Sequence, residues 1–267
     1  MLFGEYGVIA GGEGLAIPWP DFFACWVEEI ELSSAYKPHL QQFASWLAEQ
    51  GFDAALDVAQ LQHDLQHGID MASNIPIGYG VGSSGAVVAA VYDRYVRAPI
   101  SLDDLPALRN MLASMENFFH ATSSGLDPLV CYVQKPVHII GDSIRVIESP
   151  LPLELLNMRL LDCGNARSTH ALVSVFRERM QNAVFRDAMQ EYVHLSNSCI
   201  HALLLGDAAN LCTQMRHLSA WQLQYFDFAI PEHMRTEWQE ALETGSHFYK
   251  LCGAGGGGFM LVCAPCK

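Results

Sequence analysis

The chain has 267 residues, with 15 Lys and Arg against 29 Asp and Glu, and a net charge of −14. This acidic balance, without a basic stretch, argues against binding to a nucleic-acid backbone. Apolar residues make up 51% of the chain, which is enough for one large domain or two closely packed lobes. The sequence has no apolar run of about 18 residues and no leader-like first segment, so we expect a cytoplasmic protein without a membrane span.

Strands and helices are predicted to be mixed along the chain. The first half is predicted to contain strands within 15–32, a helical stretch from 38 to about 66, a strand at 68–77, a glycine-rich loop at 78–85, and helices at 86–96 and from 101 to about 119. The second half is predicted to contain a hairpin at 137–140 and 144–147, helices at 168–226 and 231–244, and a strand at 259–263. This order predicts an α+β fold with a lobe boundary near residue 150.

The strongest local signal is the segment 76–85, PIGYGVGSSG. Three alternate glycines and two serines, between a strand and a helix, let backbone amides approach an anion, and the positive end of the helix points to the same place. No lysine follows the last glycine, as a Walker A loop requires, and the G-x-G-x-G spacing differs from the dinucleotide fingerprint. The segment therefore predicts a phosphate-binding loop of another kind.

A second glycine-rich loop lies at 253–259 and leads into the last predicted strand. A dinucleotide site needs the opposite order, with the loop leading into a helix, so such a site is disfavoured. Residues with almost no side chains instead predict backbone that packs closely against a ligand or another loop.

A third signal is the pair of carboxylates in the segment 116–128, ENFFHATSSGLDP. Glu116 is predicted near the end of a helix, and Asp127 in a loop, where the following Pro128 would keep it extended. Phosphoryl transfer to an alcohol needs a carboxylate near the attacking hydroxyl and oxygen ligands for Mg²⁺. The two side chains fit these roles, although a carboxylate beside a turn is more often a solvated cap.

The three motifs, in this order, resemble the signature motifs of the GHMP kinases, and among these the mevalonate kinases. The opening segment 4–18 and the tripeptide at 167–169 are also similar to that family, and position 85 carries Gly where Ala is commoner. The resemblance implies a two-lobed α+β fold. It has a ribosomal S5 domain 2-like N-terminal lobe at 1–150, which binds ATP, and a ferredoxin-like C-terminal lobe at 151–267.

The resemblance also implies a reaction, the phosphorylation of the 5-hydroxyl of mevalonate by ATP with Mg²⁺, in isoprenoid precursor synthesis. Asp127 would be the catalytic carboxylate, and Ser84 and Glu116 would be the Mg²⁺ ligands. The residues expected to cradle the ATP phosphates are Gly78, Gly80, Gly82, Ser83 and Ser84. The residues expected at the substrate are Glu5, Tyr6, Thr169, Gly255 and Gly256. An aromatic cluster around Trp221 is expected in the core or at a subunit contact, which leaves a homodimer open.

One position departs from the family pattern. The family has a catalytic lysine on its first strand, two residues before the position of Met1, so we expect a native upstream segment that carries it and weak or no activity without it. If another cation compensates, Lys250 and Arg167 are the candidates. Two alternatives to a mevalonate kinase stay open. One is a GHMP kinase for another small alcohol, such as phosphomevalonate or a sugar, and the other is a non-catalytic ligand-binding relative.

Overall fold

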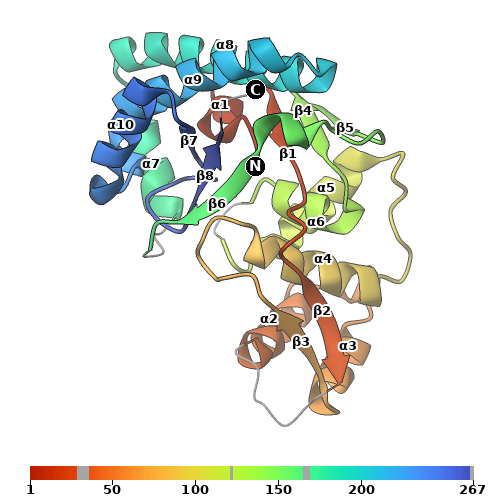
Figure 1. Cartoon of the computed structure of the whole chain (residues 1–267). Helices are drawn as coiled ribbons and strands as arrows, with labels where there is room; N and C mark the ends of the chain where they lie inside the picture. The colour runs from red at the N-terminus through yellow and green to blue at the C-terminus, as the bar shows by residue number, and fades with distance from the viewer. Residues whose placement is uncertain (29–35, 121–122, 165–168, 265–267) are drawn as a thin grey trace. The chain divides into compact units, whose positions relative to one another are not determined.

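The computed structural model describes residues 1–28, 36–120, 123–164 and 169–264 (Figure 1). The chain divides into two compact units. Unit 1 contains residues 1–17, 77–81 and 136–267, and unit 2 contains residues 18–76 and 82–135. These units differ from the expected lobes, because the first 17 residues and the hairpin after residue 136 pack with the C-terminal part of the chain.

Unit 1 contains two three-stranded antiparallel sheets. In spatial order the first sheet consists of β1 (Gly14–Ala16), β4 (Val137–Ile140) and β5 (Ser143–Val146), and the second of β6 (Met158–Asp162), β8 (Phe259–Cys263) and β7 (Phe248–Leu251). The predicted hairpin and the predicted last strand are both confirmed. The apolar β8 is the middle strand of its sheet, where it is paired on both sides.

The helices of unit 1 are α1 (Glu5–Ile9), α7 (Thr169–Arg179), α8 (Ala183–Leu205), α9 (Ala208–Tyr225) and α10 (Arg235–Thr244), with short 3₁₀ turns at Leu153–Leu156, Asp227–Ala229 and Glu232–Met234. The long helices α8 and α9 lie side by side (Figure 1). Gly206, with a φ of 70°, ends α8, and Asp207 caps the first turn of α9. The rings of Tyr192 in α8, Trp221 in α9 and Phe226 at the end of α9 contact one another and are buried, so the aromatic cluster belongs to the core of unit 1.

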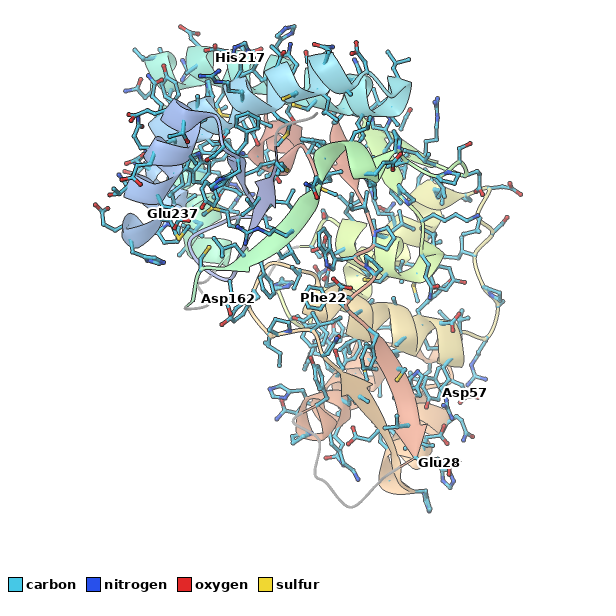
Figure 2. The ribbon with its side chains drawn as sticks, in the orientation of Figure 1. Phe22, Glu28, Asp57, Asp162, His217 and Glu237 are labelled. Atoms are coloured by element: carbon cyan, nitrogen blue, oxygen red, sulfur yellow. The ribbon has the colours of Figure 1, made fainter. Side chains whose placement is uncertain are left out.

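The described residues of unit 2 form an antiparallel pair of strands, β2 (Ala24–Glu28) and β3 (Ile69–Ser73), and five helices. These helices are α2 (Lys37–Glu49), α3 (Val58–Gln66), α4 (Ser83–Tyr95), α5 (Leu105–Glu116) and α6 (Leu126–Val133). The helical stretch expected at 38–66 is interrupted after α2, because Gly51 adopts a φ of 77° and a 3₁₀ turn follows (Phe52–Ala54). Asp57, labelled in Figure 2, then caps α3 by accepting a hydrogen bond from the amide of Gln60 at 3.2 Å.

Two helix starts differ from the expectation. Helix α4 begins at Ser83 instead of residue 86, because the left-handed Gly82 stands immediately before it. Asp127 does not lie extended in a loop, because it belongs to the first turn of α6. Proline is tolerated in a first turn, where its missing N–H has no helical partner in any case, so Pro128 does not prevent the helix. That part of the prediction was wrong.

The fold class predicted from the sequence, α+β, is confirmed. Every strand pair in the described part of the chain is antiparallel. The described residues therefore do not show the alternation of helices and parallel strands that defines an α/β fold. Among the described residues, no helix combines the length and the apolar character that crossing a membrane requires.

Candidate functional site

The predicted phosphate-binding loop ends at the start of helix α4. Gly78, Gly80 and Gly82 have φ angles of 81°, 73° and 78°, which L side chains rarely adopt. Ser83, Ser84 and Gly85 form the first turn of the 13-residue helix. The first amides of a helix lack intrahelical partners and carry the positive end of its dipole, so this turn is suited to an anion.

The hydroxyl of Ser84 forms a hydrogen bond with a buried carboxylate in unit 2. Its Oγ donates to Oε1 of Glu116 at 2.8 Å. Glu116 is the last residue of α5 and is 4% exposed. Burial raises the pKa of Glu116, the negative charge of Asp127 raises it further, and hydrogen bonds from Ser123 and Ser84 oppose the shift. A second negative charge near a buried carboxylate is the arrangement that a cation would stabilise.

Asp127 packs directly against the glycines of α4. A Cβ atom added to Gly82 would lie 3.7 Å from Cβ of Asp127, and one added to Gly85 would lie 2.8 Å from its carbonyl carbon. No side chain fits at Gly85 without moving α6. Unit 2 thus brings together four of the predicted residues, Gly82, Ser84, Glu116 and Asp127.

The donor set of this cluster fits Mg²⁺. Ser84 and Glu116 offer only oxygen atoms, and Mg²⁺ is usually held by one or two protein ligands together with water and substrate phosphates. Across the described ranges, this cluster included, no group of three or more His, Cys, Asp or Glu side chains could hold a metal ion.

The other half of the phosphate-binding loop lies in unit 1, against the second glycine-rich loop. The amide of Phe259 donates to the carbonyl of Tyr79 at 3.3 Å. A Cβ atom on Gly258 would lie 2.6 Å from Cα of Tyr79, and one on Gly80 would lie 3.0 Å from the carbonyl oxygen of Cys252. The prediction that the second loop packs closely against another backbone is therefore confirmed. The two glycine loops touch.

Residues 47–135, which include Ser84, Glu116 and Asp127, match the family described as "GHMP kinases N terminal domain". The chain has the fold of the GHMP kinases. It is 28% identical over 223 residues to a mevalonate kinase of Pyrococcus horikoshii, an alignment that covers 79% of this chain and 64% of that protein. The chain therefore spans less than two thirds of the length of this curated relative.

Solved structures show the same fold at low sequence identity. The crystal structure of L. major mevalonate kinase in complex with R-mevalonate has a TM-score of 0.69 and 18% identity, covering 98% of this chain and 84% of that one. Streptococcus pneumoniae phosphomevalonate kinase in complex with phosphomevalonate and AMPPNP has a TM-score of 0.57 and 16% identity, covering 99% and 89%. The resemblance to the GHMP kinases stated from the motifs is confirmed.

Glu5 and Tyr6, predicted at the substrate, are both tied to other parts of unit 1 of this GHMP kinase fold. The carboxylate of Glu5 forms an ion pair with Lys250, and the two side chains are 2% and 1% exposed. Lys250 also donates to the carbonyl of Leu251 at 2.7 Å. The hydroxyl of Tyr6 donates to the carbonyl of Ala254, in the second glycine-rich loop, at 2.7 Å, and burial raises the pKa of this hydroxyl. Of the two residues, Tyr6 therefore contacts the second glycine-rich loop directly.

The structure gives fewer contacts for the other three residues predicted at the substrate. Gly255 and Gly256 pack against the 3₁₀ turn that contains Ala229, whose carbonyl accepts the amide of Gly256. Thr169 is the first residue of α7. Arg167 lies outside the described residues. The substrate roles of these residues stay predictions.

Two residues of the cluster were missed from the sequence. His120 places Nε2 3.1 Å from Oγ of Ser84, and Ser123 donates to Oε2 of Glu116. His120 stands four residues after Glu116, the last residue of α5. This i, i+4 spacing is the one sequence signal that could have predicted its place near that carboxylate. Ser123 carries no such signal, because its contact depends on how the chain turns back after α5.

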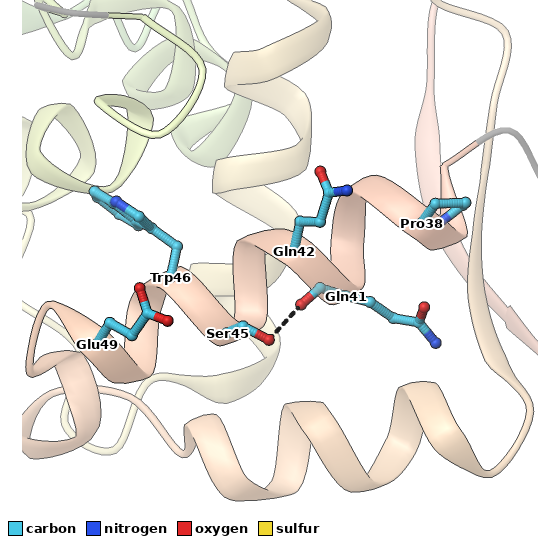
Figure 3. Close-up of a pocket in the computed structure, with 6 residues that line it drawn as sticks. All are labelled: Pro38, Gln41, Gln42, Ser45, Trp46 and Glu49. Carbon is cyan, nitrogen blue, oxygen red and sulfur yellow. Dashed lines mark hydrogen bonds between the residues drawn. The ribbon is translucent and has the colours of Figure 1, made fainter.

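A separate hollow lies on helix α2 (Figure 3). It measures about 390 Å³ and is lined by Pro38, Gln41, Gln42, Ser45, Trp46 and Glu49. None of the predicted site residues lines it, so it is no part of the phosphate-binding cluster.

Proposed function

We propose that the chain is an ATP-dependent kinase that phosphorylates the 5-hydroxyl of mevalonate in the cytoplasm, with Mg²⁺ as cofactor. The observation that carries this proposal is the cluster of Ser84, Glu116 and Asp127 at the start of helix α4. The names of the matched relatives and the R-mevalonate in the L. major structure support the choice of alcohol.

The ATP phosphates would bind at the first turn of α4. The amides of Gly82 to Gly85 have no partners from a preceding turn, and the glycines at 78, 80 and 82 leave no side chains between the loop and an anion. Ser83 would add a hydroxyl donor. Since the chain has a net charge of −14, local amide dipoles rather than overall charge would attract the nucleotide.

Ser84 and Glu116 would hold Mg²⁺ through oxygen atoms. When bound, the ion would neutralise charge on the phosphates and orient the transferred group. The positive charge of the ion would then offset the repulsion between the buried Glu116 and Asp127. The AMPPNP in the phosphomevalonate kinase structure supports a nucleotide as the phosphoryl donor.

Asp127 would serve the attacking alcohol. Its carboxylate would accept the hydrogen bond of the 5-hydroxyl and orient that oxygen toward the terminal phosphorus. As the new O–P bond forms and the bond to the ADP oxygen breaks, the hydroxyl proton would pass to Asp127. Asp127 lies in the first turn of α6, where the positive end of the helix dipole would favour a negatively charged side chain.

Glu5, Tyr6, Thr169, Gly255 and Gly256 would shape the mevalonate pocket. Tyr6 would act through the second glycine loop, because its hydroxyl is committed to Ala254. Glu5 would act through the ion pair with Lys250.

An ADP-release assay over a panel of alcohols tests the proposal. We expect turnover with mevalonate and Mg²⁺, little turnover with phosphomevalonate or sugars, and loss of turnover in Asp127→Asn. Because the resemblance implies a lysine two residues before Met1, the assay is run in parallel on a chain extended by a first strand that carries this lysine, and inactivity of both chains would refute the kinase assignment. A sugar as the preferred substrate would refute the choice of mevalonate.

A further inference from the structure

Ser123 contacts both Glu116 and the turn that leads into the helix of Asp127. Its hydroxyl donates to Oε2 of Glu116 and accepts the amide of Gly125 at 2.9 Å. A serine hydroxyl has one proton, so these two contacts use it as donor to the carboxylate and as acceptor from the backbone. The result is a continuous path from the Gly125 amide to Glu116.

Both oxygens of Glu116 are therefore held by serines. Ser84 binds Oε1 at 2.8 Å from the first turn of α4, and Ser123 binds Oε2 from the segment that follows α5. The backbone of Ser123 is itself fixed, because its amide donates to Oδ1 of Asn117 at 3.1 Å. Linked hydrogen bonds of this kind strengthen one another in a buried setting.

The other end of the path is the start of helix α6. Gly125 is the residue before the helix, and its φ of 69° suits only glycine there. A Cβ atom on Gly125 would lie 2.4 Å from the carbonyl oxygen of Arg109 and 2.8 Å from Cβ of Ala113, so the turn is pressed against α5. Asp127 follows two residues later and packs on Gly82 and Gly85.

From these contacts we propose that Ser123 is a positioning residue that couples the cation-binding carboxylate Glu116 to the placement of Asp127. The inference rests on the proposed kinase function. A cation that fixes Glu116 would also fix the hydroxyl of Ser123, the amide of Gly125 and hence the first turn of α6. Without Ser123, the cation could still bind, but the order it imposes would not reach Asp127.

Hydrogen exchange at the amide of Gly125 measures this coupling directly. In the unsubstituted protein, we expect Mg²⁺ and ADP to slow exchange at this amide by about fivefold or more, since ligands that order a segment suppress its local opening. In Ser123→Ala, calorimetry should still detect binding of Mg²⁺ and ADP, while the slowing at the Gly125 position falls below about twofold. In the same variant, kcat should fall about tenfold or more, because sub-ångström misplacement of a catalytic group is costly.

Two further variants separate coupling from general damage. Ser123→Thr keeps the hydroxyl and should restore most of the protection and turnover. Ser114→Ala removes an exposed hydroxyl that bonds only the Asn110 carbonyl in α5, and it should behave like the unsubstituted protein. Full protection at Gly125 in Ser123→Ala would overturn the inference. Failure of the unsubstituted protein to bind Mg²⁺ and ADP would instead overturn the proposed function, and the inference with it.

Discussion

The contact between helices α4 and α6 at Gly85 makes a sharp test of the site. A Cβ atom at this position would lie 2.8 Å from the carbonyl carbon of Asp127 and from the nitrogen of Pro128, about 0.6 Å short of ordinary contact at 3.4 Å. Both neighbours are backbone atoms, so the Gly85→Ala substitution must move α6 or α4. The resembling family motif commonly has Ala here, so the variant asks whether this chain depends on a closer helix spacing.

Two effects of opposite sign act on the stability of Gly85→Ala. Ala in a helix is favoured over Gly by about 1 kcal/mol, and overpacking a core costs about 1–3 kcal/mol. We therefore expect the free energy of unfolding to fall by up to about 2 kcal/mol. In catalysis, no favourable effect offsets the movement of Asp127. A displacement of this residue by about 0.6 Å should therefore lower kcat by about tenfold or more.

Denaturant unfolding and the ADP-release assay measure the two effects separately. Ala90→Gly, in the same helix, calibrates the propensity term in the opposite direction. A Gly85→Ala protein that is more stable by the full propensity term, with unchanged kcat, would show that α4 and α6 are not in tight contact and would refute the reasoning.

Other predictions address the charges of the site. Asp127→Asn should lower turnover at least ~100-fold, the usual scale for loss of a general base, while calorimetry still shows nucleotide binding. Glu116→Gln should raise the Mg²⁺ requirement of turnover and weaken nucleotide binding together. Because the pKa of Glu116 is raised, the folded chain keeps a proton that the unfolded chain releases, so stability should decline as the pH rises above 4.5, and Glu116→Gln should flatten that decline in denaturant titrations. Glu5→Leu should cost about 3–5 kcal/mol of unfolding free energy by stranding Lys250, and adding Lys250→Met should restore part of it.

Much of the fold followed from local patterns in the sequence. Two apolar runs on either side of Gly141 and Asp142 predicted the β4–β5 hairpin. The helix predicted from residue 101 begins four residues later, at Leu105, because Asp104 caps it by accepting the amide of Ala107 at 3.1 Å. The start of α6 was missed because the rule that a residue before proline avoids the helical region does not hold in a first turn. The five-residue helix α1 was missed as well, since a glycine in its middle hides so short a pattern.

The candidate site likewise combines residues that sequence motifs indicate with residues that only the folded chain brings close to them. The resemblance to the family motifs assigned roles to Ser84, Glu116 and Asp127, and unit 2 places these three residues in one cluster. The partners that hold these residues, His120 and Ser123, depend on the path of the chain after α5, which spacing does not give.

The ion pair of Glu5 and Lys250 joins residues 245 positions apart, and it bears on whether Lys250 could supply positive charge to a phosphate. Lys250 was a candidate to supply positive charge at the phosphates. Its side chain is 1% exposed and its ammonium group is bound to Glu5, so moving it would leave that carboxylate buried without a counter-charge. Breaking such a pair costs about 3–5 kcal/mol, comparable to what a single charged contact to phosphate returns in a site of this kind. The charge of Lys250 is therefore committed to Glu5, and we do not expect Lys250 to supply positive charge to a bound phosphate.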